Sequence, residues 1–449
     1  MKTARKAVLA LLLFVLILSL FAGCGQAAGN QTATSTAADS ASVASETTAA
    51  STAAETTTLR FALYDYTLYN YDKEIVESFI KDNPNIKIDL LDTTNQQYQD
   101  KITVMLAGGE DIDVLYSKSM AHFGSMANNS QLMQLDDLFA RDKIDTAPYR
   151  DGLDKFCKID GRLYGMPYRQ DFTLLYYNKD IFDKANEPYP TNDWTWDDYR
   201  ATAKKLTSGE GNDKIWGAFI EPKLSLYEAL GVIKGEGDLI TGPYSQLKDG
   251  LTLLNDMTLV DKSAPDYATN KSLSRDQIFF EKGTSALFFT GDWMMNILSM
   301  DKNAGKTNIN WGVVRLPAWK GMPQATQVSA TPVVMNAKTT KKEAAWTLIK
   351  YISGEKGATI MGKNLMMPGY MSDSVIKAME SNPQFPKEGS EAINGSKLQY
   401  NAFTGDKNSG AINSMLNEEI GKIATNNISI DEGIANMEKR RKEIVEQNK

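Results

Sequence analysis

Two short clusters of aromatic and hydrogen-bonding side chains are candidates for contact with a ligand. Tyr64, Asp65 and Tyr66 follow one apolar segment of the chain, and Tyr116 and Ser117 follow another. Tyrosine offers an apolar ring face and a hydroxyl group, and Asp and Ser add further hydrogen-bonding groups. Such side chains suit a solute with flat apolar faces and a polar rim. We therefore expect Tyr64, Tyr66 and Tyr116 to belong to a binding site.

The surrounding pattern predicts the elements that position these clusters. Residues 59–63 alternate apolar and polar as in a strand, and residues 75–80 carry apolar residues at helical spacing. Residues 86–90 alternate again, residues 98–106 return to helical spacing, and residues 112–116 form a short apolar run. The order β-α-β-α-β predicts a parallel sheet, in which ligands bind at the carboxyl ends of the strands. Both tyrosine clusters follow such strand ends.

The scarcity of metal-binding side chains limits the chemistry of the chain. Its 449 residues include one histidine, His122, and two cysteines, Cys24 and Cys157. Zinc and haem sites need such ligands in clusters, so we expect no metal and no cofactor. We predict Cys157 to be a buried apolar residue without a disulfide partner. The net charge of −7, with no basic run after the first residues, argues against a nucleic-acid partner.

The first residues have the pattern of an export signal. Residues 1–6 are basic, residues 7–22 are almost all apolar, and the small residues Ala22 and Gly23 precede Cys24. The apolar run is shorter than the ~20 residues that a membrane-spanning helix needs. The segment resembles the lipobox of bacterial lipoproteins, which implies removal of residues 1–23 and attachment of a diacylglycerol to the thiol of Cys24. The alternative is an uncleaved membrane anchor.

A tether is predicted between this cysteine and the folded part. Residues 27–58 are mostly Ala, Ser and Thr, with Val43 as the one large aliphatic residue. Such a segment cannot bury enough apolar surface to offset the entropy lost on ordering. We therefore predict a disordered tether over 24–58 and a folded part that begins near Leu59. The residues that follow are enough for two sizeable cores.

Several short motifs follow one another along the chain, at residues 107–114, 160–167, 175–182, 194–199, 280–293, 311–317 and 342–346. One is the run Asp160–Pro167, and another is Trp194–Tyr199. Taken in order, they resemble family 1 of the extracellular solute-binding proteins, the maltose-binding-protein-like receptors of ABC importers, in which a run similar to Trp194–Tyr199 starts a helix. A single motif of this kind is a weak signal, whereas an ordered series is a strong one.

The resemblance implies an α/β fold of two lobes, each a mainly parallel sheet flanked by helices, joined by a hinge. It also implies a monomeric lipoprotein, not an enzyme, that captures a mono- or oligosaccharide between the lobes and delivers it to the permease subunits of an ABC importer. The anchor would hold it at the outer face of the cytoplasmic membrane, as in Gram-positive bacteria. The implied lobes are 59–170 with 328–371 and 171–327 with 372–449, with crossings near 168–172 and 328–331.

The resemblance further implies the residues that touch solute. Asp171 and Glu221 match the positions of two cleft acids, and carboxylates suit sugars because they accept hydrogen bonds from several hydroxyl groups. Trp293, preceded by Asp292, matches an aromatic residue on which a sugar ring stacks. Each residue also has a purely structural interpretation. Asp171 could pair with Arg169 at the surface or cap a helix, Glu221 could mark a loop, and Trp293 could belong to the core.

Other notable residues are assigned to structure. Thr195 and Asp198 form the pattern of a capping box at the start of a helix, with Trp196 inside it. Tyr176 and Tyr177 resemble a paired-tyrosine iron ligand, but they lie in an apolar strand, so we predict that both belong to the core.

Two alternatives to sugar capture share these residues. A receptor for a peptide or another non-sugar solute would use the same fold. A glycoside-acting enzyme could use Asp171 and Glu221 as an acid and a base or nucleophile. Among sugars, maltose itself is disfavoured because Ser117 and Lys223 replace two aromatic residues of the maltose receptors. An acidic sugar is a minor hypothesis, with Arg169 and Lys223 as its partners.

Overall fold

The computed structural model describes residues 56–221, 224–272, 278–395, 398–403, 406 and 408–447. The export signal, Cys24, the predicted tether as far as residue 55, and Lys223 lie outside the described residues. None of the helices described is long and apolar enough to cross a membrane.

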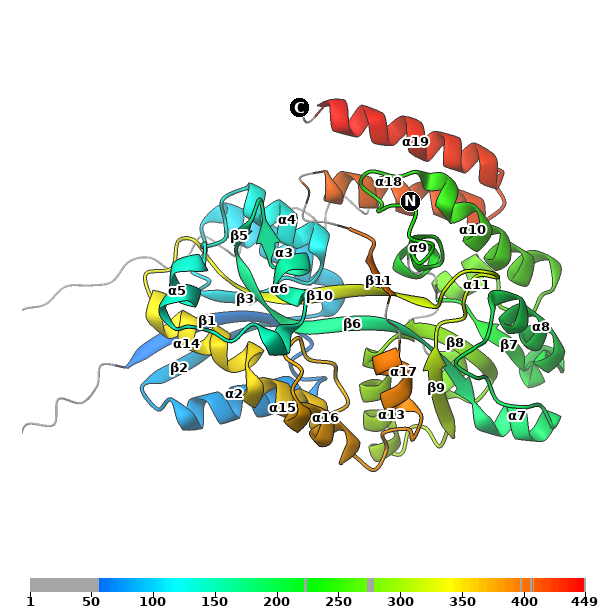
Figure 1. Ribbon diagram of the computed structural model, residues 1–449, viewed down its shortest axis with the longest axis horizontal. Helices are drawn as coiled ribbons and strands as arrows, with labels where there is room; N and C mark the ends of the chain where they lie inside the picture. The colour runs from blue at the N-terminus through cyan, green and yellow to red at the C-terminus, as the bar shows by residue number, and fades with distance from the viewer. Residues whose placement is uncertain are drawn as a thin grey trace, which may run out of the picture. The chain divides into compact units, whose positions relative to one another are not determined.

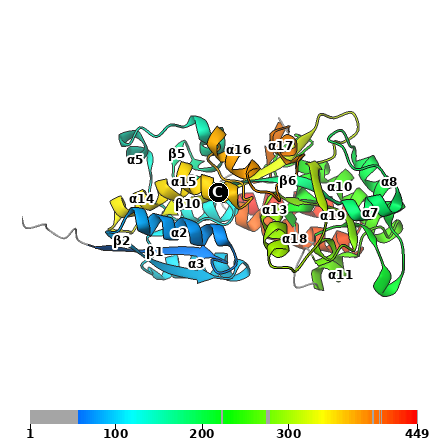
Figure 2. The same cartoon turned by 90° about the horizontal axis from the view of Figure 1, so that it is seen from below.

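The first part of the fold has the predicted order of strands and helices. Strand β1 (Thr57–Tyr64) pairs in parallel with β2 (Ile86–Thr93) on one side and with β3 (Val114–Tyr116) on the other. Helices α2 (Asn70–Asp82) and α3 (Asn95–Gly108) connect these strands and lie on opposite sides of β1 (Figures 1 and 2). The strand begins two residues before the expected Leu59, because Thr57 and Thr58 already pair with β2.

Two long strands connect this part with the rest of the fold. Strand β6 (Gly165–Asn178) is buried along its whole length and pairs antiparallel with β10 (Ala325–Met335), which in turn pairs with β3. The first half of β6 pairs with β10, and the second half pairs with β8 (Ser285–Gly291) and β9 (Trp311–Arg315). The two expected crossings lie opposite each other in this ladder, with Phe172 paired to Val328.

The second part of the sheet is mixed, and the expectation of a mainly parallel sheet does not hold there. Strands β8 and β9 both run antiparallel to β6, and only β7 (Trp216–Phe219) runs parallel to β8. The reason is that β6 continues directly out of the first part, so the neighbouring strands return beside it in the opposite direction. The strand order is β2-β1-β3-β10-β6-β8-β7, with β11 beside β10 and β9 beside β6.

Helices cover both faces of the sheet. In the first part, α3 and α4 (Met120–Asn128) lie on one side, and α2, α14 (Lys342–Ser353) and α15 (Glu355–Lys363) lie on the other (Figure 1). Other elements are β4 (Lys158–Ile159), β5 (Arg162–Leu163), β11 (Leu398–Asn401), α5 (Asp136–Arg141), α6 (Gly152–Phe156), α7 (Lys179–Ala185), α8 (Trp196–Leu206), α9 (Leu224–Val232), α10 (Lys248–Asn255), α11 (Tyr267–Ser272), α12 (Ile278–Glu281), α13 (Trp293–Asn303), α16 (Asp373–Glu380), α17 (Gly389–Gly395), α18 (Ser409–Ala424) and α19 (Ile430–Gln447).

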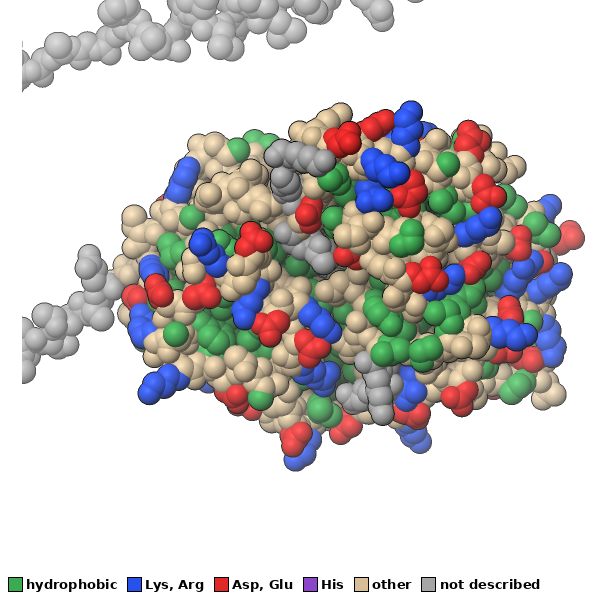
Figure 3. Space-filling view, turned by 45° about the horizontal axis from the view of Figure 1, so that its top comes forward, with side chains coloured by type: hydrophobic (Ala, Val, Ile, Leu, Met, Phe, Trp, Pro, Cys, Tyr) green, Lys and Arg blue, Asp and Glu red, His purple; other side chains and the backbone are tan. Residues whose placement is uncertain are grey.

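Buried apolar side chains form two clusters, one centred on β1, β3 and α14 and the other on α8, α10 and α18. Several structural assignments are confirmed. Thr195 and Asp198 form the capping box, and Trp196 is buried behind it. Tyr176 and Tyr177 are buried in the core, as predicted, and Cys157 is a buried free thiol. The acidic and basic side chains on the face shown in Figure 3 are interspersed rather than gathered into one basic patch.

Candidate functional site

A pocket of about 650 Å³ lies where the long strands β6 and β10 meet the ends of β1 and β8. We call it the central pocket. Its walls come from segments far apart in the sequence: the turn after β1, the residues after β3, the middle of β6, the first half of β10, the middle of α9 and one side of α13. The residues that define it in the argument below are Tyr64, Asp65, Tyr69, Lys118, Arg169, Asp171, Glu221, Glu228, Trp293, Asp301 and Phe403.

The ring of Trp293 lies in the wall of the central pocket, in space that is free because Gly291 has no side chain. The indole is partly buried and packs against the first apolar cluster at the start of α13. A Cβ atom on Gly291 would lie only 1.7 Å from Cζ3 of the ring. The carbonyl oxygen of the same glycine accepts a hydrogen bond of 3.1 Å from the Tyr176 hydroxyl group. The sequence Gly-Asp-Trp therefore places a flat ring directly over the end of a strand.

Asp171 and Arg169 form a buried ion pair in the wall of the pocket. They are two residues apart on β6, so their side chains leave the same face of the strand. Nη2 of Arg169 donates to Oδ1 of Asp171 at 2.7 Å, and both side chains are about nine-tenths buried. The ion pair with Arg169, which was the structural alternative for Asp171, is therefore present, but it lies in the pocket wall rather than at the surface. Nε of Arg169 is buried and makes no hydrogen bond within the described protein.

Two glutamates add carboxyl groups on another wall of the pocket. Glu221 follows β7, is 1% exposed, and accepts a hydrogen bond of 3.0 Å from the Thr290 hydroxyl group. Glu228, on α9, is also 1% exposed, and its Oε1 is buried without a hydrogen-bond partner. Burial raises the pKa of Glu228 well above its usual value, because the charged form loses hydration.

Glu228 was not predicted from the sequence, although a signal was present. It is the one charged residue of α9, whose sequence is otherwise Leu, Ser, Tyr, Ala, Gly and Val. A carboxyl group in a helix with so little polar surface must be buried, and a buried carboxyl group needs a partner or a function. Lys118 and Asp301 were also missed as residues of the pocket wall.

The structure brings four of the seven expected solute contacts into the central pocket: Tyr64, Asp171, Glu221 and Trp293. Tyr64 is 7% exposed, and burial raises the pKa of its hydroxyl group to about 12, so it is a neutral hydrogen-bond donor at physiological pH. Tyr66 is half-buried beside β2, where its backbone N–H donates to Asp92, and it does not line the pocket.

Tyr116 and Asp292 lie behind the pocket wall, contrary to expectation. The ring of Tyr116 stacks on that of Tyr168 with centroids 4.1 Å apart, and its hydroxyl group donates to buried Asp72 at 2.9 Å. Asp292 is fully buried and accepts a hydrogen bond of 2.7 Å from the Phe172 backbone N–H. Burial, followed by the nearby charge of Asp171, raises the pKa of Asp292 well above its usual value. Both residues support the wall rather than face the cavity.

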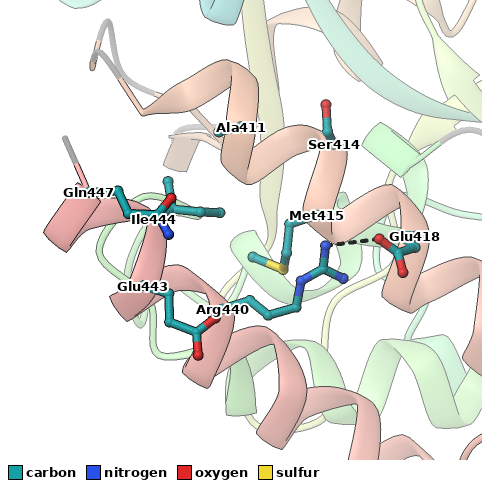
Figure 4. A pocket seen from close by; sticks show the side chains of 8 residues that line it. All are labelled: Ala411, Ser414, Met415, Glu418, Arg440, Glu443, Ile444 and Gln447. Atoms are coloured by element: carbon teal, nitrogen blue, oxygen red, sulfur yellow. Dashed lines mark hydrogen bonds and ion pairs between the residues drawn. The ribbon is translucent and has the colours of Figure 1, made fainter.

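A second, smaller pocket of about 370 Å³ lies between α18 and α19 (Figure 4). Arg440 crosses it and donates to Glu418 at 2.8 Å and to buried Glu419 at 2.6 Å. The guanidinium group of Arg440 is thus already paired within the protein, so this pocket is a less suitable binding site than the central one.

No metal centre is found among the residues that the structure describes, since no three His, Cys, Asp or Glu side chains are grouped to hold an ion. His122 is buried in α4, and burial lowers its pKa to about 4, so its ring is neutral at physiological pH.

The pattern of the family described as "Bacterial extracellular solute-binding protein" matches residues 66–359. The arabinooligosaccharide-binding protein of Bacillus subtilis is 24% identical over 300 residues, which are 63% of this chain and 66% of that protein. A putative binding protein of Brucella abortus is 25% identical over 205 residues, 43% of this chain and 47% of that protein. The chain thus spans about half the length of the first curated relatives that it matches.

Solved structures cover the whole fold. The crystal structure of a sugar transporter from Rhizobium etli in an open conformation is 31% identical with a TM-score of 0.74, and the match covers 86% of this chain and 99% of that one. An ABC substrate-binding protein from Listeria monocytogenes in complex with cycloalternan has a TM-score of 0.77 at 24% identity, with 87% and 99% covered. The second likeness supports the two-lobed α/β fold alone.

Proposed function

This chain belongs to the family of bacterial extracellular solute-binding proteins, and from that premise we propose that it is the sugar-binding component of an ABC importer. It would capture a mono- or oligosaccharide in the central pocket and deliver it to the membrane permease. The observation that carries the proposal is the combination, in one pocket, of the Trp293 ring with the carboxyl groups of Asp171 and Glu221.

This combination matches the two kinds of surface on a sugar. The C–H groups of a pyranose ring form an apolar face that packs against an indole, and the hydroxyl groups around the rim need hydrogen-bond acceptors. Carboxylates accept short, strong hydrogen bonds from hydroxyl groups. Nε of Arg169 and the hydroxyl group of Tyr64 supply donors for the sugar oxygens.

Capture would involve closure of two lobes about the paired strands β6 and β10. The proposed lobes are 59–170 with 328–371 and 171–327 with 372–449, with the first strand extended to Thr57. The ladder between Phe172 and Val328 lies at these boundaries. Hinge closure around a ligand is the established behaviour of such binding proteins.

The protein would work at the outer face of the cytoplasmic membrane. We propose that export removes residues 1–23, that Cys24 carries a lipid, and that residues 24–56 separate the folded part from the bilayer. A single short acyl chain binds membranes weakly, whereas a diacylglycerol with its two chains gives a stable anchor. The folded part, tethered to the membrane through Cys24, could then reach the permease subunits.

A glycoside-acting enzyme is the second candidate, and Glu228 is the observation that favours it. A carboxyl group whose pKa is raised by burial keeps its proton to a higher pH than usual, which is the direction that a general acid needs. The family, however, is described by solute binding rather than by catalysis. A receptor for a peptide or another non-sugar solute is the third candidate.

A thermal-shift screen of the purified folded part tests these candidates. Neutral and amino sugars, polyols, amino acids and short peptides would be added at ~100 times a typical Kd, where a bound ligand stabilises the folded state by about 2.7 kcal/mol. We expect a higher Tm with one class of saccharide only. A response to peptides alone would refute sugar capture. The responding sugar would then be incubated with the protein and analysed by chromatography, where any cleavage product would indicate the enzyme.

A further inference from the structure

The central pocket carries an excess of acidic groups. Among the described residues that line it, Asp65, Asp171, Glu221, Glu228 and Asp301 are acidic, and Lys118 and Arg169 are basic. Arg169 is already engaged by Asp171 in the ion pair at 2.7 Å.

The second basic group is also committed within the protein. Nζ of Lys118 donates to the backbone carbonyl oxygen of Asn95, at the start of α3. Asp301 is paired in turn with Lys306 at 3.2 Å, so three basic groups stand against five acidic groups and an acidic excess remains. A concave site lined by one sign of charge concentrates solutes of the opposite sign.

A second observation, independent of the charge count, is that Glu228 has a buried oxygen atom that a ligand group could pair with. Its side chain is almost fully buried, it lines the pocket, and its Oε1 has no hydrogen-bond partner in the described protein. Leaving a buried carboxyl oxygen without a partner costs free energy, and the cost is larger when the group is ionised. A ligand cation beside Glu228 would offset this cost by stabilising the ionised carboxyl group.

We propose that the central pocket selects a carbohydrate that carries a protonated amine, and that the ammonium group pairs with Glu228. This inference rests on the proposed function and names the substrate class of the same site. An ammonium group has three N–H donors, so it can bond to Glu228 and still reach a second acceptor in the pocket. The face of Trp293, in the same pocket, suits a cation as well as a sugar ring.

Matched sugars provide the test. Glucosamine, galactosamine and their di- and trisaccharides would be compared with the N-acetylated sugars and with the parent sugars that carry a hydroxyl group in place of the amine. Isothermal titration calorimetry at pH 7 on the full-length protein gives Kd for each. We expect the best amine to bind at least 10-fold more tightly than both of its neutral counterparts.

Variants then assign the preference to Glu228. Glu228→Gln keeps the shape and an acceptor but cannot ionise beside a cation, and we expect it to reduce the preference for the amine at least 10-fold while the Kd of the neutral sugar changes by less than 3-fold. Glu432→Gln, on the exposed face of α19, removes the same charge far from the pocket and should change neither value.

The outcomes separate this inference from the proposed function. If neutral sugars bind as tightly as their amines or more tightly, sugar capture stands and the amine proposal is wrong. If the amine preference persists in Glu228→Gln, Glu228 is not the partner and the proposal is also wrong. If no carbohydrate binds, the proposed function itself fails, and this inference fails with it. The comparison of sugars on the parent protein needs no variant, so it can refute the proposal even if Glu228→Gln folds poorly.

Discussion

Gly291→Ala is expected to abolish most sugar binding without removing any side chain that touches the sugar. The added Cβ would lie 1.7 Å from Cζ3 of Trp293 and 2.1 Å from Cε3 and Cη2. Carbon atoms pack at about 3.5 to 4.0 Å, so the ring must move by roughly 2 Å. The ring is only partly buried, so it can move into the pocket instead of disrupting the core.

The size of the effect follows from the contact that is lost. Stacking of a sugar face on an indole combines buried apolar area with aromatic contact, for a total of about 1 to 3 kcal/mol. Displacing the ring by roughly 2 Å removes most of that contact, which corresponds to about a 5- to 150-fold increase in Kd. Trp293→Ala should lose a similar amount, since both substitutions remove the ring from the same place.

Calorimetry and intrinsic fluorescence provide the measurements. The change in emission on adding the sugar that responds in the screen should be reduced in both variants, with the other six tryptophans as a constant background. Gly108→Ala is the matched control, because a Cβ on Gly108, in α3, has no neighbour within 4 Å. Binding by Gly291→Ala with the affinity and fluorescence response of the parent would refute the stacking role of Trp293.

The other predictions concern charge and anchoring. Asp171→Asn should weaken sugar binding by about 2 to 5 kcal/mol and also lower the stability of the empty protein, measured by urea unfolding, since it leaves buried Arg169 uncompensated; an unchanged Kd would remove Asp171 from the site. Burial raises the pKa of Asp72 from 3.8 to about 6, so the folded protein holds its proton more tightly and the free energy of unfolding should fall by about 2 kcal/mol as the pH rises from about 4 to 6. Asp72→Asn should flatten this fall in urea titrations, and parallel curves for the two proteins would contradict the assignment. Cys24→Ala should move the protein from the membrane fraction to the medium with unchanged sugar binding, whereas retention in membranes would indicate an uncleaved anchor.

Local patterns in the sequence were enough to predict the local structure. Alternation and helical spacing predicted the order from β1 to β3, because each of these elements buries one apolar face on the same sheet. The capping box of Thr195 and Asp198 depends on residues three positions apart, so it could be predicted without any tertiary information. The mixed sheet of the second part could not, since it depends on how β6 pairs after it leaves β10.

The misplaced site residues show where local patterns are insufficient. Tyr116 does end a strand, as expected, but its hydroxyl group turns to Asp72, 44 residues earlier in the chain. Asp292 lies beside Trp293 in the sequence, yet it bonds to the backbone of Phe172 on a different strand. In both cases a distant partner decides between the pocket and its supporting wall, and no spacing within the sequence carries that information.

Substitutions at Asp171 and Glu221 should differ in their effect on stability, because Asp171 lies on strand β6 and Glu221 does not. Asp171 lies on the strand that pairs with β10 through Ser329 and is bonded to Arg169, so its substitution perturbs the junction of the sheet as well as the pocket. Glu221 follows β7 and accepts a hydrogen bond from the neutral hydroxyl group of Thr290, a bond that the amide oxygen of a glutamine can also accept. A loss of sugar affinity in Glu221→Gln at unchanged stability would therefore report on solute contact alone, which makes it the sharper test of the site.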